Sequence, residues 1–296
     1  MSVSAGDTVE LVIDAHAQLA ESPVWDERTG RLVWVDLLGG IVHLTDIANG
    51  ADVALPVDQM VGAVALCEDG RLVIAVEDGF ARLDPSRGHV EIIAPVTAAD
   101  AGMRMTDGKV DPSGRFWAGS MALDEHAGAG TLYRLDPDRS ATAMLDGLTI
   151  PNGLDWSADG RTMFYIDTTT SRVDAFDYDD ASGTISGRRP VVTIDPKEGF
   201  PDGMTLDAEG FLWVALFDGW GVHRYAPDGR LDRRIVVPAA QCTSVAFGGR
   251  DYDELYITTG QEGFPAGGLP GQPNAGGIFR CRPGVRGRAP NRFRGI

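Results

Sequence analysis

The sequence predicts an all-β fold, a six-bladed β-propeller with four antiparallel strands in each blade. Three observations carry this prediction: a short unit recurs along the chain, its copies are about 40 to 50 residues apart, and helical periodicity is nearly absent. A period in the forties built from strands and turns is typical of propeller blades. The six copies begin at Val24, Ala65, Lys109, Leu154, Thr205 and Val245.

Each copy of the unit has the composition of a β-hairpin. Aromatic and β-branched runs, such as the one from Leu32 to Val35, flank turns built on Asp, Asn or Gly. Segments that begin at Thr131, Ser171 and Gly221 are expected to form third strands, and the apolar segments before the next copy to form fourth strands. The alternative is a β-sandwich with coincidental turns, which six copies in phase make unfavourable.

The chain shows no linker or shift in composition that would divide it, so residues 1–296 are expected to form a single domain. The Gly/Pro-rich stretch 263–277 is interpreted as a loop on the last blade, because the strand-like sequence GGIFR follows it. Residues from about 281 to 296 form a basic tail. Because Phe293 is its only aromatic residue, we expect a solvated tail rather than a nucleic-acid-binding arm.

Composition and charge exclude several classes of partner. The net charge of −17 opposes binding to nucleic acid and to anionic membrane surfaces, and no stretch of about 18 apolar residues is present. The N-terminal segment has acidic residues where a secretory leader needs basic ones. Three scattered cysteines fit a reducing compartment. We therefore expect a cytoplasmic protein, monomeric or weakly homo-oligomeric, whose partner is a small molecule.

One position of the repeat departs from the apolar pattern. It lies four residues before the last apolar residue that precedes each Asp/Gly turn, at the start of an otherwise apolar strand. Blades are related by rotation about a central axis, so residues at one phase of the repeat should form a ring at one end of that axis. The six ring positions are Glu21, Gly62, Thr106, Asn152, Asp202 and Thr243.

The ring predicts a metal site. Two carboxylates and a carboxamide, from Glu21, Asp202 and Asn152, are the hard oxygen ligands that Ca²⁺, Mg²⁺ and Mn²⁺ prefer and that Zn²⁺ accepts. Without an ion, the two carboxylates would repel each other in the channel. The alternative is that Asn152 and Asp202 are ordinary turn residues in Pro-Asn-Gly and Pro-Asp-Gly. Their coincidence with Glu21 at one phase favours one bound divalent cation.

Six segments, in order along most of the chain, match the motifs of one known family. They are AESPVWD at 20–26, RMTDGKVDPSGRFWAGSM at 104–121, NGLDWSADG at 152–160, VDAFDYD at 173–179, PDGMTLDAEGFLWVA at 201–215 and AGGIF at 275–279. On these segments the chain resembles the senescence marker protein, regucalcin and gluconolactonase family of six-bladed propellers.

The resemblance implies a function and roles for individual residues. In that family one divalent cation is held by a Glu, an Asn and an Asp that match Glu21, Asn152 and Asp202, and an Arg that matches Arg104 contacts the substrate. The implied reaction is metal-dependent hydrolysis of a sugar lactone, with Asp202 as the general base. Thr106 stands where the family has a substrate-contacting Asn, so the preferred lactone is expected to differ.

A second departure lies in the loop 122–130. The regucalcin branch has a Glu that falls on Asp124 in an ungapped alignment, which makes Asp124 a candidate substrate contact. Two other functions stay open: a phosphotriesterase or other esterase on the same metal site, and a non-catalytic calcium-binding or sugar-sensing propeller. A serine hydrolase is disfavoured, because the sequence has no GxSxG motif and its five histidines show no triad context.

Overall fold

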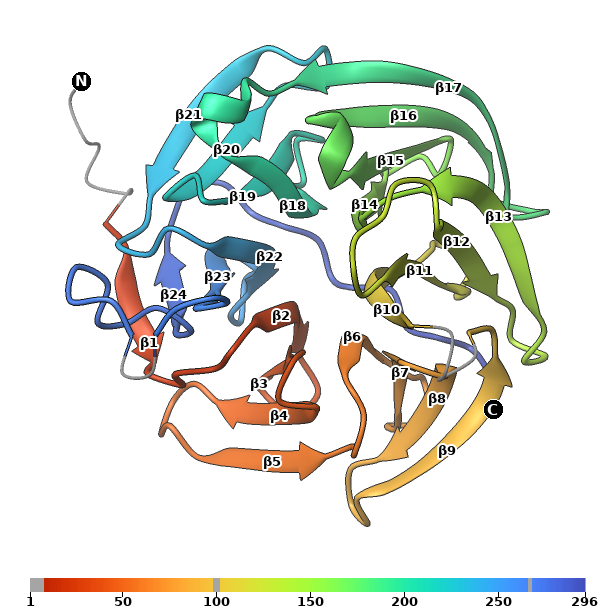
Figure 1. Ribbon diagram of the computed structural model, residues 1–296, viewed down its shortest axis with the longest axis horizontal. Coiled ribbons are helices and arrows are strands. Elements are labelled where there is room, and N and C mark those ends of the chain that lie inside the picture. The colour runs from red at the N-terminus through yellow and green to blue at the C-terminus, as the bar shows by residue number, and fades with distance from the viewer. Residues whose placement is uncertain (1–7, 98–101, 266–267, 296) are drawn as a thin grey trace.

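Six four-stranded antiparallel sheets surround a central axis, as the computed structural model shows (Figure 1). The structure describes residues 8–97, 102–265 and 268–295; the first seven residues and Ile296, the end of the predicted tail, lie outside them. The predicted six-bladed propeller is confirmed. In the first five sheets the strands follow chain order from the axis outward, and the strands predicted from Thr131, Ser171, Gly221 and GGIFR are β12, β16, β20 and β24.

The strands are short, as blades require. Two turns of 3-10 helix, Thr168–Thr170 and Pro196–Glu198, interrupt them, and no helix in the described part of the chain has the length and apolar character needed to cross a bilayer. The strands are β1 (Glu10–Ile13), β2 (Ala20–Asp26), β3 (Arg31–Asp36), β4 (Ile41–Asp46), β5 (Asp52–Pro56), β6 (Val61–Leu66), β7 (Leu72–Val76), β8 (Gly79–Asp84), β9 (His89–Pro95), β10 (Met103–Val110), β11 (Phe116–Ala122), β12 (Gly130–Leu135), β13 (Ala141–Leu148), β14 (Pro151–Trp156), β15 (Thr162–Asp167), β16 (Arg172–Asp179), β17 (Thr184–Thr193), β18 (Phe200–Leu206), β19 (Leu212–Phe217), β20 (Gly221–Tyr225), β21 (Leu231–Val236), β22 (Cys242–Gly248), β23 (Glu254–Thr259) and β24 (Ile278–Cys281).

The last sheet is completed by the start of the chain. Its order is β1-β24-β23-β22, and β1 pairs antiparallel with β24, with Glu10 opposite Arg280 and Leu11 opposite Phe279. The sequence pattern did not predict this strand, because ELVI is too short to stand out from its neighbours. The pairing makes residues 10–13 part of the last blade, so the segment between β1 and β2 ties the last blade to the first.

The repeated turn contributes hydrogen bonds to the core as well as a change of direction. Asp111 begins the turn of the third blade, and its Oδ2 accepts from Trp117 Nε1 at 2.9 Å and from the Tyr178 hydroxyl at 2.7 Å. Asp207 makes the same 2.9 Å bond to Trp213 in the fifth blade. A buried indole N–H needs such an acceptor, which accounts for the spacing of six residues between Asp and Trp in these two blades.

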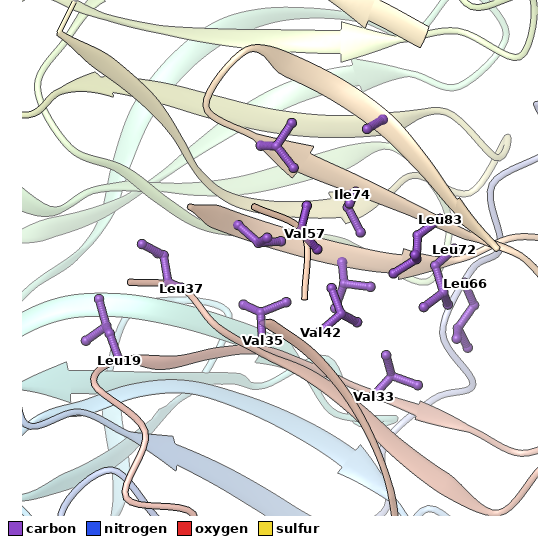
Figure 2. Packing of buried hydrophobic residues seen from close by; sticks show 14 residues of the cluster. Leu19, Val33, Val35, Leu37, Val42, Val57, Leu66, Leu72, Ile74 and Leu83 are labelled. Carbon is purple, nitrogen blue, oxygen red and sulfur yellow. The ribbon is translucent and has the colours of Figure 1, made fainter. Parts of the chain in front are cut away.

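Apolar side chains fill the space between neighbouring blades. Figure 2 shows the cluster between the first and second blades, in which Val35 and Val42 of one sheet face Leu72 and Ile74 of the other. All four side chains are almost completely buried. The strands of each blade are therefore apolar on both faces, as the sequence shows in runs such as Leu72–Val76. This packing fixes the inner strands that carry the ring positions.

The basic tail lies against the end of the axis opposite the ring. In Figure 1 it is the violet segment that passes behind the axis toward β10. It was predicted to be solvated, but Phe293 is 1% exposed and packs into a core cluster, a contact that charge counting could not show. Its hydrogen bonds reach all six blades. The Arg286 carbonyl accepts from Ala208 N at 2.8 Å. The tail donates the other bonds: Gly287 N to Tyr252 O (2.7 Å), Arg288 to Trp156 O (2.7 Å), Asn291 to Val110 O (3.0 Å), Arg292 to Asp26 Oδ1 (2.6 Å) and Phe293 N to Leu66 O (2.8 Å).

Phe293→Ala should destabilise the whole propeller. Truncation of a fully buried Phe leaves a cavity and is expected to lower the free energy of unfolding by about 3 to 5 kcal/mol. Denaturant unfolding followed by tryptophan fluorescence measures this change. Arg294→Ala is the matched control, because the exposed Arg294 only pairs with exposed Glu68 and should change stability by less than about 1 kcal/mol. Equal small losses in both variants would mean that the tail is not anchored.

Candidate active site

All six inner strands change register at the ring position. The irregularity lies between Glu21 and Val24 in β2, and equivalent shifts occur in the other five inner strands. A β-bulge re-aims side chains and leaves a residue out of the ladder, which turns the ring residue toward the axis. The other shifts are at Val61/Ala63, Met105/Gly108, Pro151/Leu154, Pro201/Met204 and Cys242/Ser244.

Glu21 is held by the residue that follows it. Ser22 has a φ of +48°, a left-handed conformation that bends the strand, and its backbone N–H donates to Glu21 Oε2 at 2.9 Å. The Ser22 hydroxyl pairs with the backbone of Val64 in the next blade, through a 3.0 Å bond from Val64 N. Only 5% of Glu21 is exposed. The Ala-Glu-Ser-Pro sequence thus places a carboxylate at the channel wall.

Asn152 is oriented by a threonine from the end of the next strand in its own blade. Its Nδ2 donates to Thr168 Oγ1 at 3.0 Å, and Thr168 in turn donates to the Pro201 carbonyl at 2.8 Å. This chain fixes which end of the amide is the nitrogen. The carboxamide oxygen is therefore available as a ligand on the cavity side.

Two buried oxygens at the ring have no protein partner. They are Asp202 Oδ1 and Thr106 Oγ1, on residues that are 6% and 3% exposed. Buried polar atoms in folded proteins are nearly always paired, and an unpaired one indicates a missing ligand, ion or water. Both atoms belong to residues that line the same cavity.

The buried carboxylates of the ring carry strongly perturbed pKa values. Burial, and then the nearby Asp107 carboxylate, raise the pKa of Glu21 to about 8. Burial raises the pKa of Asp202 well above its usual range, and the Glu21 and Asp107 carboxylates raise it further. Without a cation, these groups therefore favour the neutral form. A bound divalent ion would reverse that preference.

Asp107 belongs to this group, and the sequence analysis missed it. It lies one residue after the ring position, where Gly153 and Gly203 stand in later blades, and it is 8% exposed. Burial raises its pKa to about 6, and Lys109 partly opposes the shift. An acidic residue in place of the glycine was the signal that could have identified it.

The ring opens into a cavity of about 440 Å³. This volume lies within the range of pockets that take small molecules. Polar ring residues and the side chains of leucine, isoleucine, methionine and phenylalanine both contribute to its lining. The lining residues are Leu19, Glu21, Leu37, Arg104, Thr106, Asp107, Met121, Glu125, Ile150, Asn152, Thr168, Thr169, Phe200, Asp202, Phe217, Asp218 and Glu262.

Arg104 and Thr106 both line this cavity, whereas Asp124 does not. Burial lowers the pKa of Arg104, and the Glu262 and Glu21 carboxylates oppose this shift, which places the guanidinium among the acidic groups. The side chain of Asp124 is 76% exposed and pairs with His126 Nδ1. Its neighbour Glu125 lines the cavity instead, because the turn after β11 places the next residue over the opening.

The two remaining ring positions have structural roles. A Cβ on Gly62 would lie 2.5 Å from the carbonyl oxygens of Met105 and Thr106, so only glycine fits between these inner strands. Thr243 Oγ1 donates to the Ala20 carbonyl, which connects the last blade to the first. Neither position adds a ligand to the cavity.

The donor set fits a hard divalent cation. Glu21, Asn152 and Asp202 line one cavity, two of the three are carboxylates, and the unpaired Asp202 Oδ1 has no other partner. No group of three or more His, Cys, Asp or Glu side chains in the described residues is placed to hold a metal ion. The predicted set differs from such a group because its third donor is an amide.

Comparisons with known proteins agree with the fold. The family described as SMP-30/Gluconolactonase/LRE-like region matches residues 19–261. Regucalcin from Gallus gallus is 43% identical over 294 residues, which cover 97% of this chain and 98% of that protein. These matches span every blade of the propeller.

Two solved structures are similar over nearly their whole length. A calcium-binding protein, regucalcin, from Agrobacterium tumefaciens superposes with a TM-score of 0.91 at 29% identity, covering 97% of both chains. A luciferin-regenerating enzyme superposes with a TM-score of 0.88 at 32% identity, covering 97% of this chain and 99% of the other. On the matched family region and the near-complete alignment with regucalcin, this chain belongs to the SMP-30/gluconolactonase/LRE-like family.

Proposed function

We propose that this protein is a divalent-cation-dependent lactonase that hydrolyses a sugar lactone to the open-chain sugar acid. The observation that carries the proposal is the pair of buried carboxylates, Glu21 and Asp202, in one cavity with Asp202 Oδ1 unpaired. Membership in a family named in part for gluconolactonase supports the choice of reaction. The proposed cation is Ca²⁺, Zn²⁺, Mn²⁺ or Mg²⁺, held by Glu21, Asn152 and Asp202.

The residues of the cavity have separate roles in the proposed hydrolysis. When bound, the cation supplies Lewis-acid polarisation of the lactone carbonyl. Asp202 accepts a proton from the attacking water, whose oxygen bonds to the carbonyl carbon. The ring carbon–oxygen bond then breaks, the ring oxygen takes up the proton, and the new carboxylic acid ionises. Arg104 and Thr106 line the same cavity and are proposed to orient the sugar hydroxyls.

Asp124 was predicted as a further substrate contact, but its position does not favour that role. Its exposed side chain lies outside the cavity lining, so the contact would require the loop 122–130 to move. Arg104 and Thr106 are therefore the proposed contacts for the lactone.

A second candidate is a calcium-binding propeller without catalysis. The solved relative from Agrobacterium tumefaciens is named a calcium-binding protein, and the same three ligands would serve that function. An esterase or phosphotriesterase on the same site is the third candidate, since the same Lewis acid polarises a phosphoryl oxygen. Arg104, half-buried beside the ring, favours an enzyme that orients a polar substrate.

Chelation and re-addition of the cation test the proposal. Chelated protein should lose acid release from glucono-, galactono- and pentonolactones, after correction for spontaneous hydrolysis. One or more of Ca²⁺, Mg²⁺, Mn²⁺ and Zn²⁺ should restore it. Undiminished hydrolysis by the chelated protein would contradict the role of the cation. Tight calcium binding without hydrolysis of any lactone would favour the second candidate, and hydrolysis of a phosphotriester alone would favour the third.

The proposed setting is the cytoplasm, with the protein as a monomer or weak homo-oligomer. Cys67, Cys242 and Cys281 are all buried, and Cys67 and Cys242 are free thiols, which suits a reducing compartment. Burial and the nearby Asp202 carboxylate raise the pKa of the Cys242 thiol, so this thiol is a poor nucleophile and no part of the proposed reaction.

A further inference from the structure

The carboxylates that line the cavity lie at two levels. Three of them, on Glu21, Asp107 and Asp202, are buried at the ring. Three others are exposed and come from loops that surround the opening: Glu125 after β11, Asp218 after β19 and Glu262 after β23. We call these exposed residues the acidic rim. The rim has no counterpart in the proposed hydrolysis, which uses only groups at the ring.

The backbone places the rim carboxylates over the opening. Glu262 is clasped by the buried carboxamide of Gln241, which accepts from Glu262 N at 2.8 Å and donates to Glu262 O at 3.0 Å. Glu125 and Asp218 have φ values of +55° and +58°, a conformation that few residues other than glycine adopt. The three loops thus hold their acidic residues at the cavity in fixed backbone conformations.

The cavity is strongly acidic. Arg104 is the only cationic side chain among the described residues that line it, against six carboxylates. A bound divalent cation and Arg104 together would balance only half of these charges. The unpaired Thr106 Oγ1 belongs to a buried residue of the same lining, so a ligand that pairs with it has to pass the rim. Any ligand that carries a negative charge must therefore pass three like charges to reach its site.

Lactone hydrolysis changes the charge of the ligand, because an uncharged lactone becomes a carboxylate anion and a proton. We propose that the acidic rim selects ligands by charge: it admits uncharged lactones, and it weakens the binding of the anionic product and of lactones that carry a carboxylate. This inference rests on the proposed function for its substrate. Its physical basis is the repulsion between the rim and an anion, which acts on binding whether or not the chemistry occurs.

Glu125→Gln combined with Glu262→Gln tests the rim. Both side chains are exposed, so the isosteric substitutions should leave the fold intact, as thermal unfolding would verify. Calorimetric titration of gluconate into the cation-loaded protein measures anion binding. Each removed charge should tighten gluconate about two- to fourfold, and the double variant about four- to tenfold. Glu91→Gln, the same charge change on the outer strand β9, is the control and should leave the affinity unchanged.

Kinetics provide the second measurement. With glucono-1,5-lactone as substrate, the double variant should keep the wild-type KM within about twofold and show stronger inhibition by gluconate. With glucaro-1,4-lactone, which carries a carboxylate, its kcat/KM should rise. Gluconate binding that is the same in wild type and double variant would overturn the inference. Absence of lactone turnover would overturn the proposed function alone, because the difference in gluconate binding would persist.

Discussion

Replacing Asp202 with Asn is expected to lower kcat/KM for a lactone by about 10³-fold or more, because one change removes both a carboxylate ligand and the proposed base. The fold should survive. Asn has the same shape, and the buried Asp202 carboxyl loses an unfavourable interaction with Glu21 when its charge is removed. Lactone turnover at saturating cation, together with the thermal midpoint of the same preparation, measures both effects.

The matched control for this variant is Asp228→Asn. Asp228 lies in an exposed turn outside the cavity lining, where its Oδ1 accepts from Arg230 N at 3.1 Å. Its kcat/KM should equal that of wild type. A wild-type rate in Asp202→Asn would refute the base assignment. Loss of a cooperative unfolding transition in Asp202→Asn would instead assign Asp202 a structural role.

The stability of the cation-free protein is expected to fall steeply as the pH rises from about 4.5 to about 8. Burial beside Asp107 raises the pKa of Glu21 from 4.5 to about 8 in the folded protein. Over this interval the folded state binds more protons than the unfolded state, so stability falls with each unit of pH. Below pH 4.5 the contribution is constant, and above pH 8 it has been lost.

Denaturant unfolding in the presence of a chelator, at several pH values, measures this slope. Glu21→Gln should flatten it, because the amide does not titrate, and a saturating divalent cation should restore stability at pH 8. The same variant should bind the cation more weakly. A slope that is unchanged in Glu21→Gln would show that other groups govern the pH dependence and that the ring carboxylates do not repel each other as proposed.

The fold was predictable because several copies of the repeat indicate the same local structure. The Asp/Gly turn recurs along the chain, and in two blades its aspartate also accepts a buried hydrogen bond, as Asp111 does from Trp117. Two features were not predictable in the same way. Both β1 and Phe293 act through partners more than 200 residues away, as in the pairing of Leu11 with Phe279 and of Phe293 N with Leu66 O. A local pattern carries no signal for such contacts.

Some residues of the candidate site could be predicted from the repeat and others could not. Ring residues such as Glu21 and Asp202 could be found from the phase of the repeat, since the symmetry of the blades turns one sequence position into one place in space. Asp107 broke the repeat and was missed, although its neighbour Thr106 was found. Glu125 and Glu262 lie on loops of unequal length, which the repeat does not describe. Their approach to the cavity depends on turn conformation and on the Gln241 clasp.

The pairing of β1 with β24 has a consequence for biosynthesis. β1 is synthesised well before its partner β24, with which it pairs through Glu10 and Arg280. The sheet that contains them cannot close until the β24 segment has left the ribosome. Glu21 lies in β2, and the ring to which it belongs is completed by β22 of that same last sheet. A nascent chain therefore carries the ligands long before it can bring them together. Cation binding should appear only after β24 has left the ribosome and the last sheet has formed.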